Sequence, residues 1–140
     1  MSQYAELADM REAFGDEELV LVTTPEGQPR ETIDASRVNT ELVTASAEID
    51  SYLRQRYQMP INGTDPMIAR VCCDIARWRL WNRSDVEPSN AVRGGYKDAV
   101  AWLKAVNVGN VTLDGEIAIN VGTDFSNFVA RRPAFVGRGP

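Results

Sequence analysis

Three long stretches of this sequence repeat apolar residues at alternating intervals of three and four positions, which is the spacing of one face of an α-helix. Their apolar positions are Val38, Leu42, Ala45, Ile49 and Tyr52; Ile68, Val71, Cys72, Ile75, Ala76 and Leu80; and Val92, Tyr96, Ala99, Leu103 and Val106. Amphipathic helices of this length bury their apolar faces against one another. The pattern therefore predicts a mainly α fold, a small bundle with three long helices.

The residues at the ends of these stretches agree with helix boundaries. Asp34 and the Asp65-Pro66 pair are suited to begin the first and second helices, because Asp caps free backbone N–H groups and Pro fits the first turn. The sequence 57–60 ends the first helix, since a residue before Pro60 avoids helical dihedral angles. Gly94-Gly95 lies inside the third helix, where it either allows close packing or marks a bend.

Two shorter elements precede the long helices. Leu7, Met10 and Phe14 have helical spacing and meet Gly15, which predicts a helix over 5–14. The acids at 16–18 favour a second short helix, although the sequence VLVTT at 20–24 would also suit a strand. The segment 24–32 is a loop by composition.

Beyond Gly109 the apolar period changes to two. Val111 and Leu113 precede Asp114-Gly115, and Ile117, Ile119 and Val121 follow it. An Asp-Gly pair between alternating apolar residues predicts a β-hairpin. We therefore divide the chain into a helical domain, 1–108, and a hairpin with an extended C-terminal arm, 109–140.

The arm has a composition suited to contacts with another surface. Residues 122–140 lack periodicity and contain three phenylalanines, three arginines and a single acid. Phenylalanine supplies apolar contact area and arginine supplies directional bonds to carboxylates. We expect the arm to dock on a partner, the alternative being that it folds back on its own domain. The candidate contact residues in it are Phe125, Phe128, Arg131, Arg132 and Phe135.

Composition excludes several classes of protein. The chain has 140 residues, of which 44% are apolar and 25% charged, enough for one folded domain. The longest uncharged stretch, 105–113, is far too short to span a membrane. The N-terminus carries acids where a secretion signal carries bases, so we expect the protein to work in a reducing cytoplasm.

Charge is distributed unevenly along the chain. The net charge is −5, which argues against binding nucleic acid by neutralising phosphates. The segment 1–53 contains twelve acids and three arginines, whereas 54–140 contains twelve bases and eight acids. If the fold keeps these halves apart, the molecule has an acidic and a basic face, which suits head-to-tail association of copies. Ordinary surface variation is the alternative.

The sequence has no histidine, which removes the commonest catalytic bases and zinc ligands. Cys72 and Cys73 are adjacent, so they do not form a metal or redox motif; we expect reduced thiols with Cys72 in the core, a vicinal disulfide being the alternative. We expect no cofactor and no enzyme activity. The competing hypothesis is a small metal-dependent enzyme that uses Asp50 and Asp74, and a third is a helical regulatory module.

The second long helix carries further candidates. Asp74 can pair with either Arg70 or Arg77 along the helix surface. Trp78 and Trp81 lie on one flank and, with neighbouring arginines, either form an aromatic and basic patch or belong to the edge of the core.

Several strings in the helical part resemble a known family. They are ASAEIDSYLRQRY at 45–57, MP at 59–60, CDIARWRL at 73–80 and YKDA at 96–99. They are similar to the neck proteins of Mu-like tailed bacteriophages, a family of head-tail connectors or adaptors. The likeness also includes the N-terminus, at Tyr4-Ala5, Leu7, Phe14-Gly15 and Glu18-Leu19, and so covers about the first hundred residues. This chain departs from the pattern at Trp78, where the family more often has tyrosine, at Gly94-Gly95 and in its C-terminal tail.

The resemblance implies a structural virion protein that is assembled in the host cytoplasm. Its subunits would form a ring, twelvefold in such connectors, below the portal protein, contact the next neck or tail protein (a stopper or tail terminator), and let DNA pass without specific binding. The acidic segment 1–53 would then suit the lumen wall, because it repels phosphate. The contact candidates outside the arm are Arg54, Arg56, Tyr57, Arg77, Trp78 and Trp81.

Overall fold

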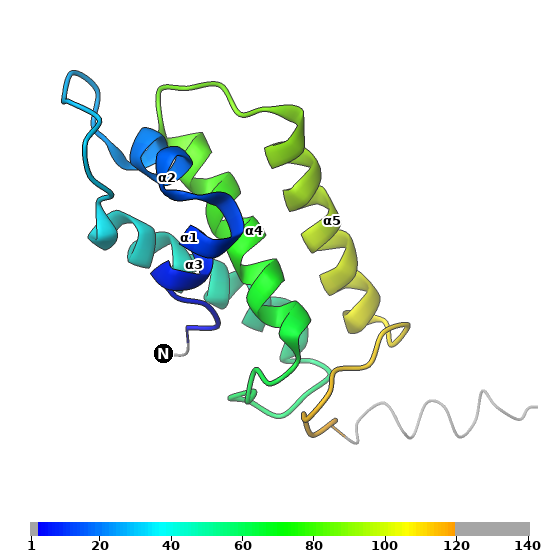
Figure 1. Cartoon of the computed structure of the whole chain (residues 1–140). Helices are drawn as coiled ribbons and strands as arrows, with labels where there is room; N and C mark the ends of the chain where they lie inside the picture. Colours follow the sequence, from blue (N-terminus) through cyan, green and yellow to red (C-terminus); the bar gives the residue numbers. More distant parts are fainter. Residues whose placement is uncertain (1–2, 120–140) are drawn as a thin grey trace, which may run out of the picture.

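The computed structural model describes residues 3–119 and contains five helices in that range. They are α1 (Leu7–Phe14), α2 (Asp16–Thr23), α3 (Ala35–Leu53), α4 (Pro66–Arg83) and α5 (Asn90–Asn107). The long helices α3, α4 and α5 pack together, with α4 in contact with both of the others. Helices α1 and α2 lie on the other side of α4 from α5 (Figure 1). The predicted bundle of three long and two short helices is therefore confirmed.

Each long helix begins at a residue whose side chain caps it. Asp34 accepts a hydrogen bond from the Arg37 backbone N–H at 3.2 Å, Asp65 accepts one from Met67 at 3.0 Å, and Ser89 accepts one from Val92 at 3.3 Å. Such bonds satisfy N–H groups that have no partner within the first helical turn. The caps predicted at Asp34 and Asp65 are confirmed.

The core consists of the predicted apolar stripes. On α3 the first four predicted positions, Val38, Leu42, Ala45 and Ile49, are fully buried and Tyr52 is partly buried, and all six predicted positions of α4 are buried. On α5 the stripe is buried except for Tyr96, which is only partly covered. Because α4 contributes the broadest buried face, it is the central helix.

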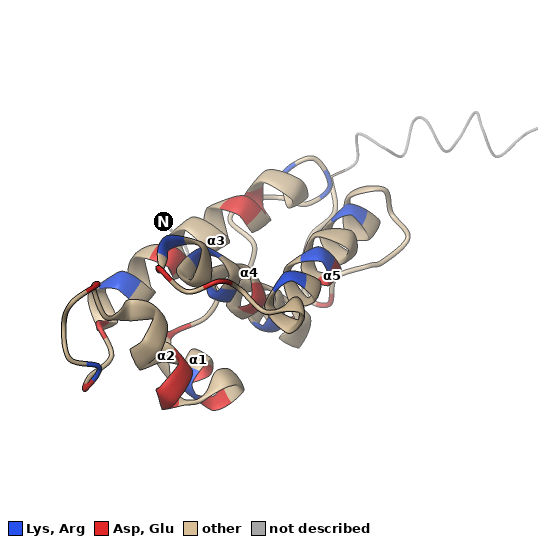
Figure 2. Ribbon diagram, turned by 90° about the horizontal axis from the view of Figure 1, so that it is seen from above, with Lys and Arg blue, Asp and Glu red and all other residues tan. Residues whose placement is uncertain are grey.

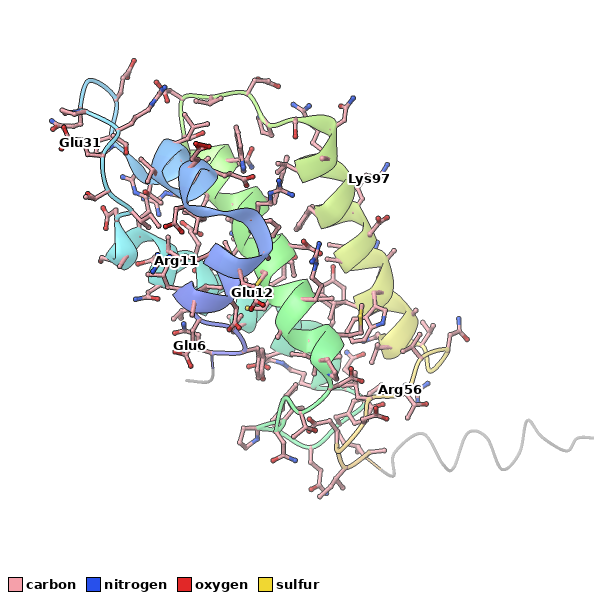
Figure 3. The ribbon with its side chains drawn as sticks, in the orientation of Figure 1. Glu6, Arg11, Glu12, Glu31, Arg56 and Lys97 are labelled. Atoms are coloured by element: carbon pink, nitrogen blue, oxygen red, sulfur yellow. The ribbon has the colours of Figure 1, made fainter. Side chains whose placement is uncertain are left out.

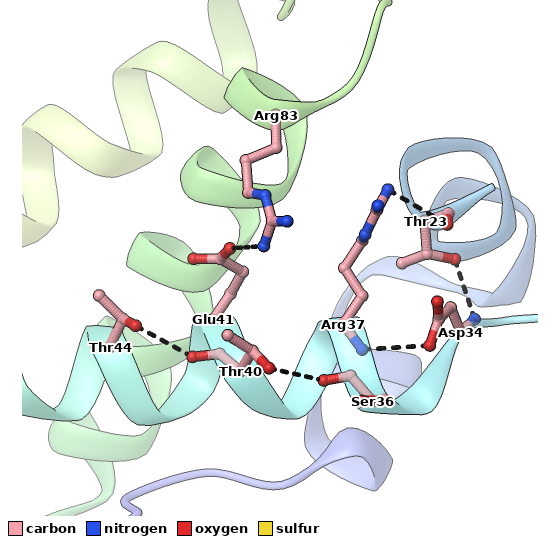
Figure 4. A network of polar contacts seen from close by, with 8 residues as sticks. All are labelled: Thr23, Asp34, Ser36, Arg37, Thr40, Glu41, Thr44 and Arg83. Atoms are coloured by element: carbon pink, nitrogen blue, oxygen red, sulfur yellow. Dashed lines mark hydrogen bonds and ion pairs between the residues drawn. The ribbon is translucent and has the colours of Figure 1, made fainter. Parts of the chain in front are cut away.

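The short helices are joined by Gly15, which has φ +89° and so adopts a conformation that other residues avoid. Helix α1 begins at Leu7, two residues later than predicted, and α2 is a helix and not a strand. The end of α2 is fixed to the start of α3, because Thr23 accepts a hydrogen bond from the Asp34 backbone N–H and another from Arg37 (Figure 4).

The glycine pair at 94–95 does not interrupt α5, which is continuous from Asn90 to Asn107. A Cβ atom at Gly95 would lie 3.7 Å from an Asp74 carboxylate oxygen, whereas no atom lies within 4 Å of a Cβ at Gly94. Gly95 thus faces α4 at close range and Gly94 faces open space.

The predicted β-hairpin is wrong for the residues that the structure describes, since 3–119 contain no strand. The Asp114-Gly115 turn is present, with Gly115 at φ +78°, but Ile117 and Ile119 bond to the backbone of 56–58 after α3, both at 2.8 Å. On the other side of the turn, Leu113 is buried in the core of the bundle and does not pair with a second strand, and its N–H donates to the Tyr57 hydroxyl. A lone hairpin buries little apolar surface, whereas the end of the bundle offers both a core and a backbone partner.

The Gly115 turn is also attached to the loop that precedes α4. Glu116 accepts hydrogen bonds from the backbone N–H groups of Asn62 and Gly63, both at 2.8 Å, and Thr64 donates to the Asp114 carbonyl at 3.0 Å. Residues 109–119 therefore lie against the helical part. None of the helices in the described range is long and apolar enough to cross a membrane.

Candidate assembly surfaces

Three arginines of α4 form ion pairs with acids of α2 and α3. Arg77 pairs with Glu18 at 2.6 Å, Arg79 with Glu48 at 2.7 Å, and Arg83 with Glu41 at 2.5 Å. Figure 4 shows the contact between Arg83 and Glu41. The Glu41 side chain is only 7% exposed. Charge-assisted bonds of this kind are stronger than neutral ones, and partial burial protects them from solvent screening.

Glu18 has the largest number of these contacts. Its two carboxylate oxygens accept from Nε and Nη2 of Arg77 at 2.6 and 2.8 Å, and one of them also accepts from the Trp81 indole at 2.9 Å. The Arg77 guanidinium lies 4.3 Å from the centre of the Phe14 ring, within the range of a cation–π contact. This cluster fixes α1 and α2 to α4.

These ion pairs bring acids of the segment 1–53 together with bases of the remaining chain. Glu18, Glu41 and Glu48 belong to the acidic segment 1–53, and their partners belong to the basic remainder. The fold therefore does not keep the two halves apart. The acids of the first half that remain exposed and have no partner among the described residues are Glu12, Glu17, Glu26 and Glu31.

The aromatic side chains of the predicted patch contact other parts of the subunit. Trp78 stacks on Tyr96 of α5 with ring centres 5.4 Å apart, and Trp81 packs against the core. Tyr96 donates to Glu48 at 3.0 Å; burial and the nearby Glu48 charge raise the pKa of its hydroxyl. The Trp78 side chain is half-buried, so one part of it remains accessible.

Arg54, Arg56 and Tyr57 lie where α3 ends. Arg54 is exposed, whereas the Arg56 Nε donates to the Asn107 carbonyl of α5 at 2.9 Å and Tyr57 is buried. Figure 3 shows Arg56 close to the end of α5. Arg56 therefore joins the ends of α3 and α5, and Arg54 is the freely accessible side chain of the three.

The same end of the bundle carries exposed apolar side chains. Met59 lies in the loop between α3 and α4, Met67 lies in the first turn of α4, and Val108 and Ile117 follow α5. Their exposed fractions are 38%, 43%, 62% and 61%. The remaining candidates Phe125, Phe128, Arg131, Arg132 and Phe135 lie outside the described residues.

The two carboxylates of the enzyme hypothesis have separate partners. Asp50 accepts a hydrogen bond from the Tyr4 hydroxyl, and Asp74 pairs with Arg70 at 3.4 Å and not with Arg77. Burial raises the pKa of Asp74, and Arg70 opposes that effect. No group of three or more His, Cys, Asp or Glu side chains suited to a metal ion occurs within 3–119.

Both cysteines are buried free thiols, as expected for reduced residues. The Cys72 Sγ lies 3.5 Å from the Ser46 hydroxyl, and Ser46 also accepts the Tyr4 backbone N–H. Burial raises the pKa of Cys73 to about 12, so its thiol is protonated at neutral pH. The vicinal disulfide is not formed.

Sequence reasoning missed the partners of the α4 arginines. Glu41 and Glu48 lie two turns apart on α3, and Arg79 and Arg83 lie one turn apart on α4. That spacing is compatible with pairing between neighbouring antiparallel helices, but it cannot identify the pairs without the packing of the helices.

The described residues form a small helical bundle that is held together by an apolar core and by ion pairs between its helices. Exposed apolar side chains at one end of the bundle form a candidate contact surface. The family model for Bacteriophage Mu Gp36 matches residues 4–122, and the chain belongs to this Mu-like phage protein family. It is 27% identical to Gene product J of Escherichia phage Mu over 146 residues, covering 95% of this chain and 99% of the relative. It is 36% identical to the Mu-like prophage FluMu protein gp36 of Haemophilus influenzae over 90 residues, covering 64% of this chain and 59% of that protein.

Proposed function

We propose that this protein is a structural subunit of a phage particle, located in the neck between head and tail. Copies form a closed ring of about twelve subunits below the portal protein. The ring binds the portal on one side and the next neck or tail protein on the other, and genomic DNA passes through its lumen. The protein has no enzymatic role, and no cofactor is needed.

The observation that carries this proposal is the match to the Mu Gp36 family over 4–122 and to phage Mu Gene product J over nearly the whole of both chains. A match along the entire chain supports a common role for the whole subunit. The strings at 45–57 and 73–80 resemble Mu-like neck proteins; the first covers the end of α3 and the residues that follow it, and the second lies on α4, the central helix.

The charges that remain exposed support a lumen wall in the loop between α2 and α3. Glu26, Arg30 and Glu31 are exposed there and have no partner among the described residues, which leaves one net negative charge on these three side chains. Figure 3 shows Glu31 on the part of the loop that projects from the bundle. Carboxylates on a channel wall repel phosphate, so DNA can slide without binding. A ring with a basic lumen would contradict this assignment.

The C-terminal arm is proposed as a connection to a partner. The exposed side chains Met59, Met67, Val108 and Ile117 lie at the end of the bundle from which the chain continues toward residue 120. The arm beyond that point has three phenylalanines and three arginines. An ordered arm costs about 1 to 2 kcal/mol per residue of backbone entropy, so it needs a partner that buries its rings.

The proposal is tested by removing the gene product from the phage that encodes it. We expect DNA-filled heads and free tails that do not join, and joined particles after the protein is supplied in trans. A version that ends at Asp124 should fold with an unchanged melting temperature yet fail to enter particles. Normal yields of joined particles without the protein would refute the neck function, and full incorporation of the shortened chain would refute the role of the arm.

A further inference from the structure

We propose that neighbouring copies join by placing the outer face of α5 of one subunit against the α1–α2 face of the next. This inference rests on the proposed ring and names the two surfaces that would build it. The occupant of each surface is a second copy of this chain. The argument depends on charge, on exposure and on the positions of the two faces in the bundle.

The α1–α2 face is acidic. These two helices contain five acids and one arginine, and that arginine, Arg11, is paired with Asp16. Glu12 and Glu17 are exposed, and neither forms an ion pair with any side chain in the described range. A shallow groove of about 400 Å³ lies beside Glu12, between α1 and α4. Asp9 and Arg70 also line it, and Arg70 is paired with Asp74 of α4, so the unpaired charge at the groove is negative. A basic side chain of a partner fits this surface.

The outer face of α5 is a stripe of opposite charge. Lys97, Ala101, Lys104 and Val108 are all exposed and follow one another at intervals of four, three and four residues, which places them on one side of the helix. Neither lysine is paired with an acid in the part of the chain that the structure describes. Ala101 between them is small, so a partner can approach the helix closely, and Val108 adds apolar contact area.

One acid lies beside this stripe. Asp98 is exposed, but it follows Lys97 directly and is therefore turned about 100° around the helix, away from the stripe. Its negative charge adds to the rise in the pKa of Asp74 of α4, which burial mainly causes. Asp98 thus belongs to the side of α5 that faces α4, and the stripe itself carries only positive charge.

The two faces belong to different sides of the subunit. Helix α4 lies between α5 and the α1–α2 pair in both ribbon views (Figures 1 and 2). Figure 3 shows Lys97 projecting from α5 on the side turned away from α1. Two complementary surfaces at different positions make a head-to-tail contact, which does not stop at a dimer and gives a ring where the rotation between neighbouring subunits closes. Two copies of either face alone would repel each other.

The test uses two variants that reverse the charge of one face each. The first is Lys97→Glu with Lys104→Glu, and the second is Glu12→Lys with Glu17→Lys. Native mass spectrometry follows ring formation by each variant, alone and on the portal protein of the same phage, with one variant labelled with ¹⁵N. All four side chains are exposed, so we expect both variants to remain folded, and circular dichroism checks this.

A matched control changes the same amount of charge in the same acidic half of the chain. Glu26→Lys with Glu31→Lys reverses two exposed acids of the loop between α2 and α3. Only ring formation is compared for this control, because its two acids are proposed to line the lumen but the loop lies outside both proposed faces. It should form rings at the same protein concentration as the wild type.

We expect each reversed variant alone to need about 100-fold more protein for half-assembly, because like charges then face each other at every contact. Mixing the two should restore rings in which labelled and unlabelled subunits alternate, and so should combining all four changes in one chain. Rings that form equally well from either variant, or a mixture that fails to assemble, would overturn the pairing and leave the neck function in place.

Two other outcomes separate the possible failures. If the variant with altered α5 forms normal rings but no longer retains DNA, α5 faces DNA and the pairing is wrong. If the wild type remains monomeric even on the portal protein, the proposed function fails and the pairing fails with it.

Discussion

Glu18→Gln replaces one carboxylate oxygen by an NH₂ group, and we expect this small change to lower the stability of the protein strongly. The carboxylate accepts two hydrogen bonds from Arg77 and one from Trp81, and the Glu18 and Arg77 side chains are 17% and 21% exposed. A Gln side chain keeps the shape but turns an NH₂ donor toward the guanidinium, so at least one bond is lost and a partly buried charge loses its counter-ion. Exposed pairs contribute up to about 1 kcal/mol and breaking a buried pair costs about 3 to 5, so we expect about 2 kcal/mol for this half-buried one.

The assay is urea denaturation followed by far-ultraviolet circular dichroism. A loss of about 2 kcal/mol lowers the midpoint by about 1 to 2 M urea at an unchanged slope, and lowers Tm by about 6 to 10 °C. Glu17→Gln is the matched control, because Glu17 is the exposed neighbour without a described partner, and its effect should stay within about 0.5 kcal/mol. Equal effects of the two substitutions would show that the Glu18 cluster does not hold α2 to α4.

Three further predictions concern single side chains. Burial raises the pKa of Asp74, so its charged form costs stability at neutral pH and Asp74→Asn should raise Tm at pH 7. This gain should shrink as the pH falls and disappear below the ordinary pKa of an Asp carboxyl, where the group is protonated in the folded and the unfolded chain. A gain of the same size at low pH would contradict this cause. Gly109→Ala should lower the free energy of unfolding by about 1 to 3 kcal/mol, because Gly109 has φ +91° and a Cβ would lie 2.1 Å from Arg56 Nη2. Gly94→Ala, at a position in open space, should instead raise it by about 1 kcal/mol, and thermal melts measure both. Since burial raises the pKa of the Cys73 thiol to about 12, a thiol reagent at pH 8 should label it only after unfolding in urea, and rapid labelling of the native protein would contradict its burial.

The helices could be predicted from the sequence because their signals are local. The stripes of α3, α4 and α5, and the caps Asp34 and Asp65, depend on residues within a few positions of one another. The hairpin failed for the opposite reason. Its turn is local and does form, but the partner of 117–119 is the backbone at 56–58, about 60 residues earlier in the chain, and alternation of apolar residues does not indicate the partner.

The candidate contact residues also separate into what local sequence indicates and what depends on partners distant in the sequence. The sequence drew attention to Arg77 and Trp81 by their type and position, but their common partner Glu18 lies about 60 residues away, and only the packing of α2 on α4 brings it there. Uneven charge along the chain also suggested separate faces. The structure reduces that imbalance through three ion pairs and leaves distinct exposed charges on α1, α2 and α5.

The central claim is that this chain forms a closed ring on the portal. Native mass spectrometry of the purified wild type, alone and then mixed with the portal protein from the same phage, tests it most directly. We predict a single ring mass, of about twelve subunits, either in the free protein or in complex with the portal. A chain that stays monomeric and does not bind the portal at any protein concentration would contradict the account.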